Sequence, residues 1–187
     1  MTVYLDTSRL QLRQWKASDL EPFYQLNSDE EVMRYFPDVL SKSRSDAVVA
    51  RLSEMIDEKG WGFWAVEIKQ TGEFIGFVGL LAQQKSAIPN SPLVEIGWRL
   101  AKSHWGKGYA TEAAQASLKY AFETLSLSDV YSFTVLDNAP SRHVMSRIGM
   151  TNTEQDFDHP MLEDGHPLQR HCLYKITSEQ WRSANKP

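Results

Sequence analysis

The chain has 187 residues, 42% of them apolar, which is enough to bury a core and predicts a single domain over residues 1–187. The formal net charge of −4 argues against a general nucleic-acid-binding protein, because such proteins usually carry a basic surplus. No apolar run approaches the roughly 20 residues that span a bilayer, and the N-terminal stretch lacks the apolar segment of a signal peptide. We therefore expect no membrane partner and a cytoplasmic location. The one cysteine, Cys172, excludes a disulfide within the chain and agrees with a reducing compartment.

The first third of the sequence predicts one strand followed by helices. Residues 9–15 alternate apolar and polar side chains, as a half-buried strand does. Apolar residues at helical spacing follow an N-cap at Asp19, and a second short helix is predicted over residues 29–35. Residues 43–59 carry an apolar stripe and predict a longer helix, which Gly60 ends.

The rest of the chain alternates strands and helices. Residues 63–68 and 73–81 predict a hairpin, residues 93–100 a strand and residues 108–125 a long helix. A further strand is predicted over 130–136, a helix that Asn138 caps over 139–148, and strands near 150–153 and 171–177. This order predicts an α/β fold in which helices pack on both faces of a mixed sheet.

A glycine-containing loop joins the strand over residues 93–100 to the long helix. Gly106 and Gly108 allow the backbone to turn tightly and to approach a ligand. The free N–H groups and the dipole of the helix that follows make an anion site, suited to a pyrophosphate. The pattern is neither a Walker loop nor a Rossmann fingerprint, and a Gly-x-Gly loop before a helix is by itself a weak signal, since many such loops are only turns.

The run Trp105-Gly-Lys-Gly-Tyr-Ala-Thr-Glu-Ala113 resembles the pyrophosphate-binding loop of the GNAT acetyltransferases, whose general form is Gln/Arg-x-x-Gly-x-Gly/Ala. Gly108 and Ala110 match its last two positions. Trp105 departs from the first position, in the way that is usual in the branch containing the ribosomal-protein N-terminal (Ala/Ser) acetyltransferases. Two further blocks, residues 7–13 and 133–150, resemble the same family and occur in the same order.

This resemblance implies a GNAT-like domain with a mostly antiparallel, twisted sheet of about six to seven strands. It also implies direct transfer of acetyl from acetyl-CoA to an amine, with no covalent enzyme intermediate. The residues implied in acetyl-CoA binding are Trp98, Trp105, Gly106, Lys107, Gly108, Tyr109, Ala110, Thr111, Asn138 and Ser141. For Lys107 the alternative is an exposed loop lysine, and for Asn138 a helix N-cap, which does not exclude the binding role.

Glu95 is the candidate general base. It lies on a strand between Val94 and Ile96, where desolvation would raise the pKa of its carboxyl toward neutrality and suit proton removal from an amine, directly or through water. The alternative is a structural partner for Arg99, two residues further along the same face. Ser141 is the candidate acid or hydrogen-bond donor to the CoA sulfur, and its alternative role is to help start its helix.

The acceptor amine is expected to bind beside aromatic and acidic side chains, which suit a cation. The candidates are Tyr35, Phe36, Trp64, Glu95, Phe157 and His159. For Trp64 the alternative is an ordinary core residue.

We expect an N-acetyltransferase that acts on a protein N-terminal α-amine or a peptide-like amine. The alternatives are acetylation of a small molecule, such as a polyamine or an amine-bearing antibiotic, and a CoA-binding protein without catalysis. The acid- and histidine-containing loop over residues 156–166 matches no standard metal-site spacing, so no metal is expected. A homodimer is compatible with the sequence, although no feature in it specifies one.

Overall fold

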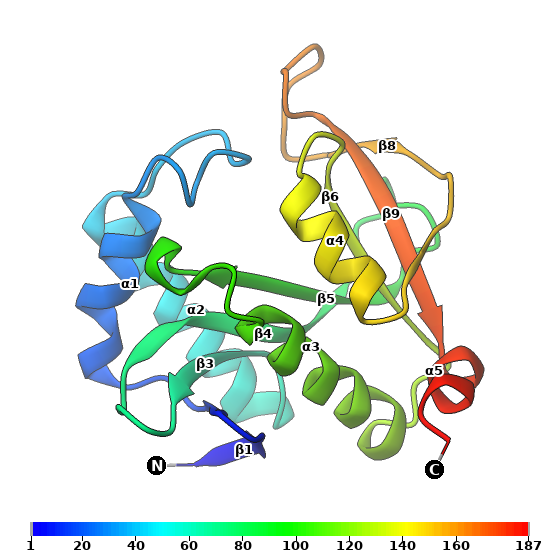
Figure 1. Ribbon diagram of the computed structural model, residues 1–187. Helices are drawn as coiled ribbons and strands as arrows, with labels where there is room; N and C mark the ends of the chain where they lie inside the picture. The colour runs from blue at the N-terminus through cyan, green and yellow to red at the C-terminus, as the bar shows by residue number, and fades with distance from the viewer. Residues whose placement is uncertain (1, 187) are drawn as a thin grey trace. The chain divides into compact units, whose positions relative to one another are not determined.

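The computed structural model describes residues 2–186, and within them the chain forms two compact units. Unit 1 contains the described residues up to Leu80 together with Gly97–Ser117. Unit 2 contains Leu81–Ile96 and the described residues from Leu118 onward. The chain passes from one unit to the other within three elements that Figure 1 labels, namely β4 (Phe74–Gln83), β5 (Leu93–Leu100) and α3 (Tyr109–Lys119).

The strands of unit 1 pair in the order in which they occur in the chain. They are β1 (Val3–Asp6), β2 (Leu10–Arg13), β3 (Phe63–Ile68) and β4, and each is antiparallel to the next. The predicted hairpin of residues 63–68 and 73–81 is confirmed as β3 and β4. Leu10 and Leu12 are fully buried, as the alternation of the first predicted strand requires.

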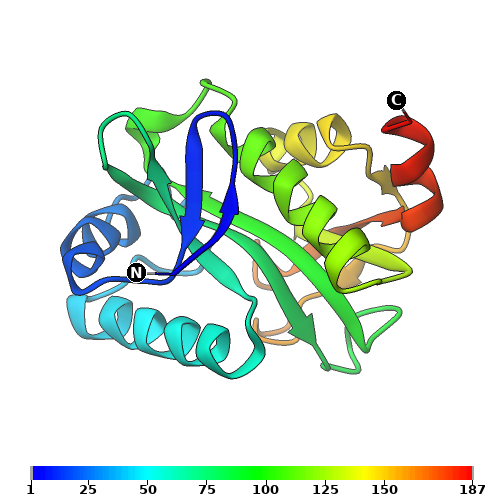
Figure 2. The same ribbon diagram turned by 90° about the horizontal axis from the view of Figure 1, so that it is seen from below.

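Two helices of unit 1, α1 (Leu20–Asn27) and α2 (Lys42–Lys59), lie side by side in Figures 1 and 2. The hydroxyl of Ser41 caps α2 by accepting a hydrogen bond from Arg44 N at 3.4 Å, and Gly60 ends it with a left-handed φ of +78°.

Two local predictions for unit 1 are wrong. Asp19 does not cap α1, because its carboxylate binds the guanidinium of Arg13 at 2.7 and 2.9 Å, and such charge-assisted pairs are strong. Residues 29–35 form turns rather than a helix. The side chain of Asp29 accepts hydrogen bonds from the backbone N–H groups of Glu31 and Val32, which offers the backbone an alternative to helical bonding.

In unit 2, β5 runs parallel to β6 (Asp129–Val135), with Glu95 opposite Tyr131. The long β9 (Arg170–Thr177) is antiparallel to β6, and two short strands, β7 (Thr151–Asn152) and β8 (Phe157–Asp158), pair with β9.

The helices of unit 2 continue α3 and flank these strands. The helix predicted over residues 108–125 is α3, and it ends in a π-helical turn at Tyr120–Thr124. Helix α4 (Ala139–Arg147) packs against β6, as Figure 1 shows, and α5 (Ser178–Ala184) follows β9.

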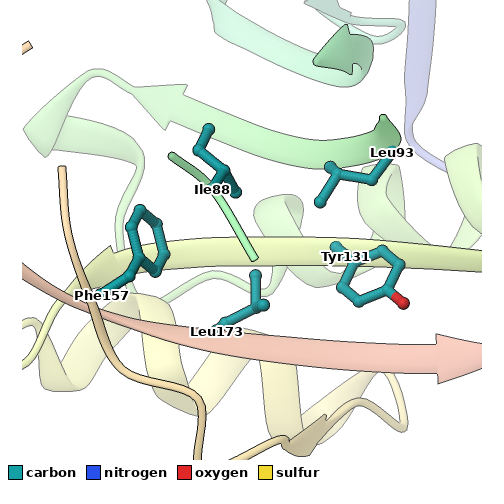
Figure 3. Close-up of a cluster of buried hydrophobic side chains, with 5 residues drawn as sticks. All are labelled: Ile88, Leu93, Tyr131, Phe157 and Leu173. Atoms are coloured by element: carbon teal, nitrogen blue, oxygen red, sulfur yellow. The ribbon is translucent and has the colours of Figure 1, made fainter. Parts of the chain in front are cut away.

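Buried side chains from strands and loops form the core of unit 2. Ile88, Leu93, Tyr131, Phe157 and Leu173 point toward one another in Figure 3. Burying each such side chain contributes about 1.5–3 kcal/mol to folding, and this contribution holds the short β8 against β9. Phe157 is therefore a core residue of unit 2.

The predicted mixed α/β fold with mostly antiparallel strand pairing is confirmed. The predicted number of strands is too low, because residues 2–186 contain nine. The strands that were missed, β1 and β8, have four and two residues, too few to show an alternating pattern. Across these residues, no helix combines the length and the apolar character needed to cross a membrane.

Candidate functional site

The loop between β5 and α3 in unit 1 has the geometry of an anion site. Gly106 and Gly108 adopt φ values of +71° and +80°, which residues with a Cβ rarely adopt. A Cβ built on Gly106 would meet no atom within 4 Å, so space is open beside the loop. Helix α3 begins directly afterwards at Tyr109, and the first N–H groups of a helix have no acceptor within it. Glycine conformation, open space and helix start together fit a bound pyrophosphate.

A hydrogen-bonded clamp holds this loop from the β1–β2 connection. The carboxylate of Glu112 accepts hydrogen bonds from Thr7 Oγ1 at 2.7 Å, Arg9 N at 2.8 Å and Arg9 Nε at 2.6 Å. Arg9 Nη1 donates to the carbonyl of Lys107 at 2.9 Å, and its guanidinium lies 4.6 Å from the ring centre of Tyr109. Burial raises the pKa of Glu112, but the bonds from Thr7 and Arg9 outweigh it and lower the pKa overall. The clamp therefore keeps Glu112 ionised and fixes the loop.

The sequence analysis did not identify this clamp. Its signal lay in two blocks that the family resemblance had singled out, residues 7–13 and 105–113, but nothing in either block shows that they meet. The side chain of Trp105 is exposed, and its Nε1 donates to the carbonyl of Leu100 at 2.9 Å. The side chain of Lys107 is exposed, which suits both of its alternative roles.

Glu95 in unit 2 has the perturbed carboxyl that was expected. Burial raises its pKa to about 7, although a hydrogen bond from Gln83 and the charge of Lys85 act in the opposite direction. Gln83 Nε2 donates to Glu95 Oε2 at 3.1 Å, which orients the carboxylate. The strand that carries Glu95 is fixed in unit 2 by Ser132, whose hydroxyl donates to the carbonyl of Ile96 at 2.9 Å. Near neutral pH this carboxyl can therefore accept and release a proton.

Asn138 caps α4 in unit 2, as its alternative role required. Its Oδ1 accepts a hydrogen bond from Ser141 N at 3.3 Å, and its Nδ2 donates to Thr134 Oγ1 at 2.8 Å. Ser141 lies in the first turn of α4 and is half-buried.

Two histidines and two phenylalanines gather in unit 2. The rings of His159 and His171 are 4.8 Å apart, and Phe133 and Phe157 lie 5.9 and 6.4 Å from His159. Burial, His171 and Lys85 lower the pKa of His159 to about 4, so its imidazole is neutral at pH 7. His159 is half-buried and offers polar atoms, whereas Phe157 belongs to the core and offers an acceptor little surface.

The acceptor-site candidates of unit 1 differ in exposure. Phe36 is 41% exposed and Tyr35 is half-buried, but Trp64 is 0% exposed and packs on Tyr4 with a centroid distance of 6.1 Å. The burial of Trp64 favours its alternative role as a core residue. Arg99, which the sequence suggested only as a partner for Glu95, donates from Nη1 to Asn27 Oδ1 at 2.8 Å. Its guanidinium lies 4.3 Å from the ring centre of Phe36.

Metal-binding side chains do not cluster in the described part of the chain, where no group of three or more His, Cys, Asp or Glu residues could hold a metal ion.

The fold resembles those of solved acetyltransferases. A GNAT-family acetyltransferase from Bacillus anthracis superposes with a TM-score of 0.77 at 26% identity, covering 94% of this chain and 98% of that one. A ribosomal-protein-S5-alanine acetyltransferase from Vibrio fischeri gives 0.73 at 16% identity, with 97% and 99% covered. A spermidine N-acetyltransferase from Vibrio cholerae, solved with CoA and spermine, gives 0.71 at 22% identity, with 93% and 98% covered.

Sequence comparison gives the family. An uncharacterized Bacillus subtilis protein, YkkB, is 36% identical over 149 residues, covering 78% of this chain and 84% of that protein. The FsC-acetyl coenzyme A-N(2)-transacetylase of Aspergillus fumigatus is 31% identical over 194 aligned positions, covering 98% of this chain and 80% of that enzyme. The model of the acetyltransferase (GNAT) domain matches residues 9–151, which include the loop, its clamp, Glu95 and Asn138. The chain therefore belongs to the GNAT family and is an acetyl-CoA-dependent N-acetyltransferase.

Proposed function

We propose that this enzyme acetylates the primary amine of a peptide-like acceptor, such as a protein N-terminal α-amine, and that Glu95 is the general base. The observation that carries the proposal is the pKa of Glu95, which burial raises to about 7. A base of this strength is half-ionised at neutral pH and can take a proton from an ammonium group. Gln83 keeps the carboxylate oriented through its hydrogen bond to Oε2.

The remaining roles follow from each unit's own geometry. Acetyl-CoA supplies the acetyl group as a thioester, which the amine attacks. In unit 1, the backbone N–H groups over residues 105–110 bind the pyrophosphate, and the side chains of Tyr35 and Phe36 contact the acceptor. In unit 2, Asn138 binds the pantetheine arm, Ser141 donates to the departing sulfur and His159 contacts the acceptor.

Acetyl-CoA binding tests the loop directly. Gly106 and Gly72 have φ values of +71° and +70°, and a Cβ on either would meet no atom within 4 Å, so replacing either one by tryptophan causes similar backbone strain. Calorimetry should show micromolar binding of acetyl-CoA by the wild type and by Gly72→Trp. Gly106→Trp should lose this binding, because only its indole fills the space beside the loop. Equal binding by the two variants would show that the pyrophosphate lies elsewhere.

A small-molecule amine is the second candidate acceptor. The Vibrio cholerae neighbour is named for spermidine and the Vibrio fischeri neighbour for a ribosomal protein, so the fold serves both classes. Turnover of acetyl-CoA with a panel of N-terminal peptides and of polyamines separates them. Acetylation of a polyamine with every peptide inert would overturn the peptide assignment, and binding without turnover would leave a CoA-binding protein. A homodimer and a cytoplasmic location stay predictions.

A further inference from the structure

Arg99 is a buried cation that lacks an anion. Its Nε is buried and has no hydrogen-bond partner, and within residues 2–186 no carboxylate lies within salt-bridge distance of its guanidinium. The polar contact that it makes is the donation from Nη1 to Asn27 Oδ1 at 2.8 Å. Burial lowers the pKa of Arg99 to about 10. A buried charge without a partner is costly, so its presence calls for an explanation.

Arg13 shows how unit 1 satisfies an arginine that serves the fold. Arg13 is 1% exposed, and Asp19 binds it at two atoms while Glu67 accepts from its Nε at 2.7 Å. Its pKa is raised, because these carboxylates outweigh the effect of burial. Arg99 has no such partners, and the direction of its pKa change is opposite. Arg99 is therefore built for an anion that the chain itself does not provide.

The surroundings of Arg99 hold it ready for such an anion. Asn27 is fully buried, and its Nδ2 donates to Ser45 Oγ at 3.0 Å, so the acceptor of the Nη1 bond is fixed. The backbone beside Arg99 is held by Ala101 N, which donates to the carbonyl of Ile75 at 2.9 Å. A guanidinium presents its N–H donors as a planar fork that matches the two oxygens of a carboxylate.

The rings around Arg99 indicate the kind of anion. Its guanidinium lies 4.3 Å from the ring centre of Phe36 and 5.3 Å from that of Phe77, and Phe36 is exposed. An apolar rim suits a carboxylate on an organic molecule better than a strongly hydrated phosphate. The phosphates of acetyl-CoA already have a site in the loop over residues 105–110. The anion is therefore assigned to the acceptor.

We propose that Arg99, with Asn27 and beneath Phe36, binds a carboxylate of the amine acceptor, so that the enzyme prefers acidic amines over polyamines. This inference rests on the proposed function and narrows its substrate class. Two sources share the chemistry: the α-carboxylate of a free amino acid and an acidic side chain next to a peptide N-terminus.

Matched pairs of amines that differ in the carboxylate alone provide the test. L-lysine is compared with cadaverine and L-phenylalanine with phenethylamine for the free amino acid. Ala-Asp-Ala amide is compared with Ala-Asn-Ala amide for the peptide. Values of kcat/KM are measured for the wild type, Arg99→Met and Arg99→Lys, with acetyl-CoA saturating.

The wild type should favour the acidic member of at least one pair by roughly 10- to 100-fold, the range that a hydrogen-bonded charge pair supports. Arg99→Met should lose this preference and leave both the KM for acetyl-CoA and the turnover of the neutral member unchanged. Arg99→Lys should restore part of it, since it keeps the charge but not the fork. A preference for the neutral member, or an equal preference in wild type and Arg99→Met, would overturn the proposal.

Two further measurements separate this inference from the proposed function. Arg99→Met should raise the thermal midpoint of the free enzyme, because it removes an unpartnered buried charge, whereas a purely structural arginine would lower it. If no amine is acetylated, the proposed function fails, and calorimetry with N-acetyl-L-phenylalanine and N-acetylphenethylamine still tests Arg99. Binding of the acidic compound that Arg99→Met abolishes would support the carboxylate site, and binding that the variant retains would refute it.

Discussion

Replacing Glu95 with glutamine should stabilise the protein at neutral pH while it removes the base. Folding raises the pKa of Glu95 from 4.5 to about 7, chiefly through burial. The native chain therefore binds more protons than the unfolded chain between these pH values, and stability is lost as the pH rises through this window. The difference of about 2.5 pH units, at 1.36 kcal/mol each, gives a penalty of about 3 kcal/mol above pH 7. Glutamine avoids it, and its side-chain oxygen can accept the same hydrogen bond from Gln83.

Urea denaturation between pH 4.5 and pH 8 measures this effect. The free energy of unfolding of Glu95→Gln should exceed that of the wild type by about 3 kcal/mol at pH 8, and the two should converge near pH 4.5. Equal stabilities at pH 8, or a less stable variant, would show that the carboxyl is not desolvated and would remove the main support for its role as base.

Glu67→Gln is the matched control, because its sign is opposite. Burial raises the pKa of Glu67, but hydrogen bonds from Lys16 and Arg13 outweigh it and lower the pKa overall. Its contribution to stability is therefore present above its unfolded pKa and lost as the pH falls. Glu67→Gln should be less stable than the wild type at pH 7, and the gap should narrow in acid.

Four further predictions follow from the two units. The kcat/KM of the wild type should rise with pH through an apparent pKa near 7, and Glu95→Gln should lose this limb in initial-rate assays. Arg9→Ala should raise the KM for acetyl-CoA about tenfold with kcat unchanged, since one charge-assisted bond to the loop is lost, and an unaltered KM would mean that the loop keeps its shape without the clamp. The imidazole of His159 should titrate near pH 4 by NMR, and a midpoint above 6 would show that it is solvated. Asn138→Ala should lower the free energy of unfolding by about 1 kcal/mol in urea, whereas Asn138→Asp, which keeps a capping oxygen, should lose much less.

Features set by neighbouring residues could be predicted from the sequence. The alternation of Leu10 and Leu12, the cap at Asn138 and the stop at Gly60 each depend on a few adjacent side chains, and the structure has them. The loop at Gly106 was predicted for the same reason, since a turn that needs positive φ selects glycine.

Features set by distant residues could not be predicted. Arg9 and Glu112 are 103 positions apart, and no pattern in either segment names the other. The same holds for Arg99 and Asn27, which are 72 positions apart. The loss of the predicted helix over residues 29–35 has a local cause, because Asp29 bonds to the backbone ahead of it, but apolar spacing alone conceals that competition.

The cofactor loop has an evolutionary consequence, because it binds through peptide groups and not through side chains. Descendants inherit such a site as a backbone shape, which asks little of the sequence beyond two glycines and a helix start. The residues proposed to meet the acceptor, such as Phe36, Arg99 and His159, act through their side chains and can change one at a time. A lineage with this architecture can therefore exchange one amine for another by point substitution while its acetyl donor stays the same.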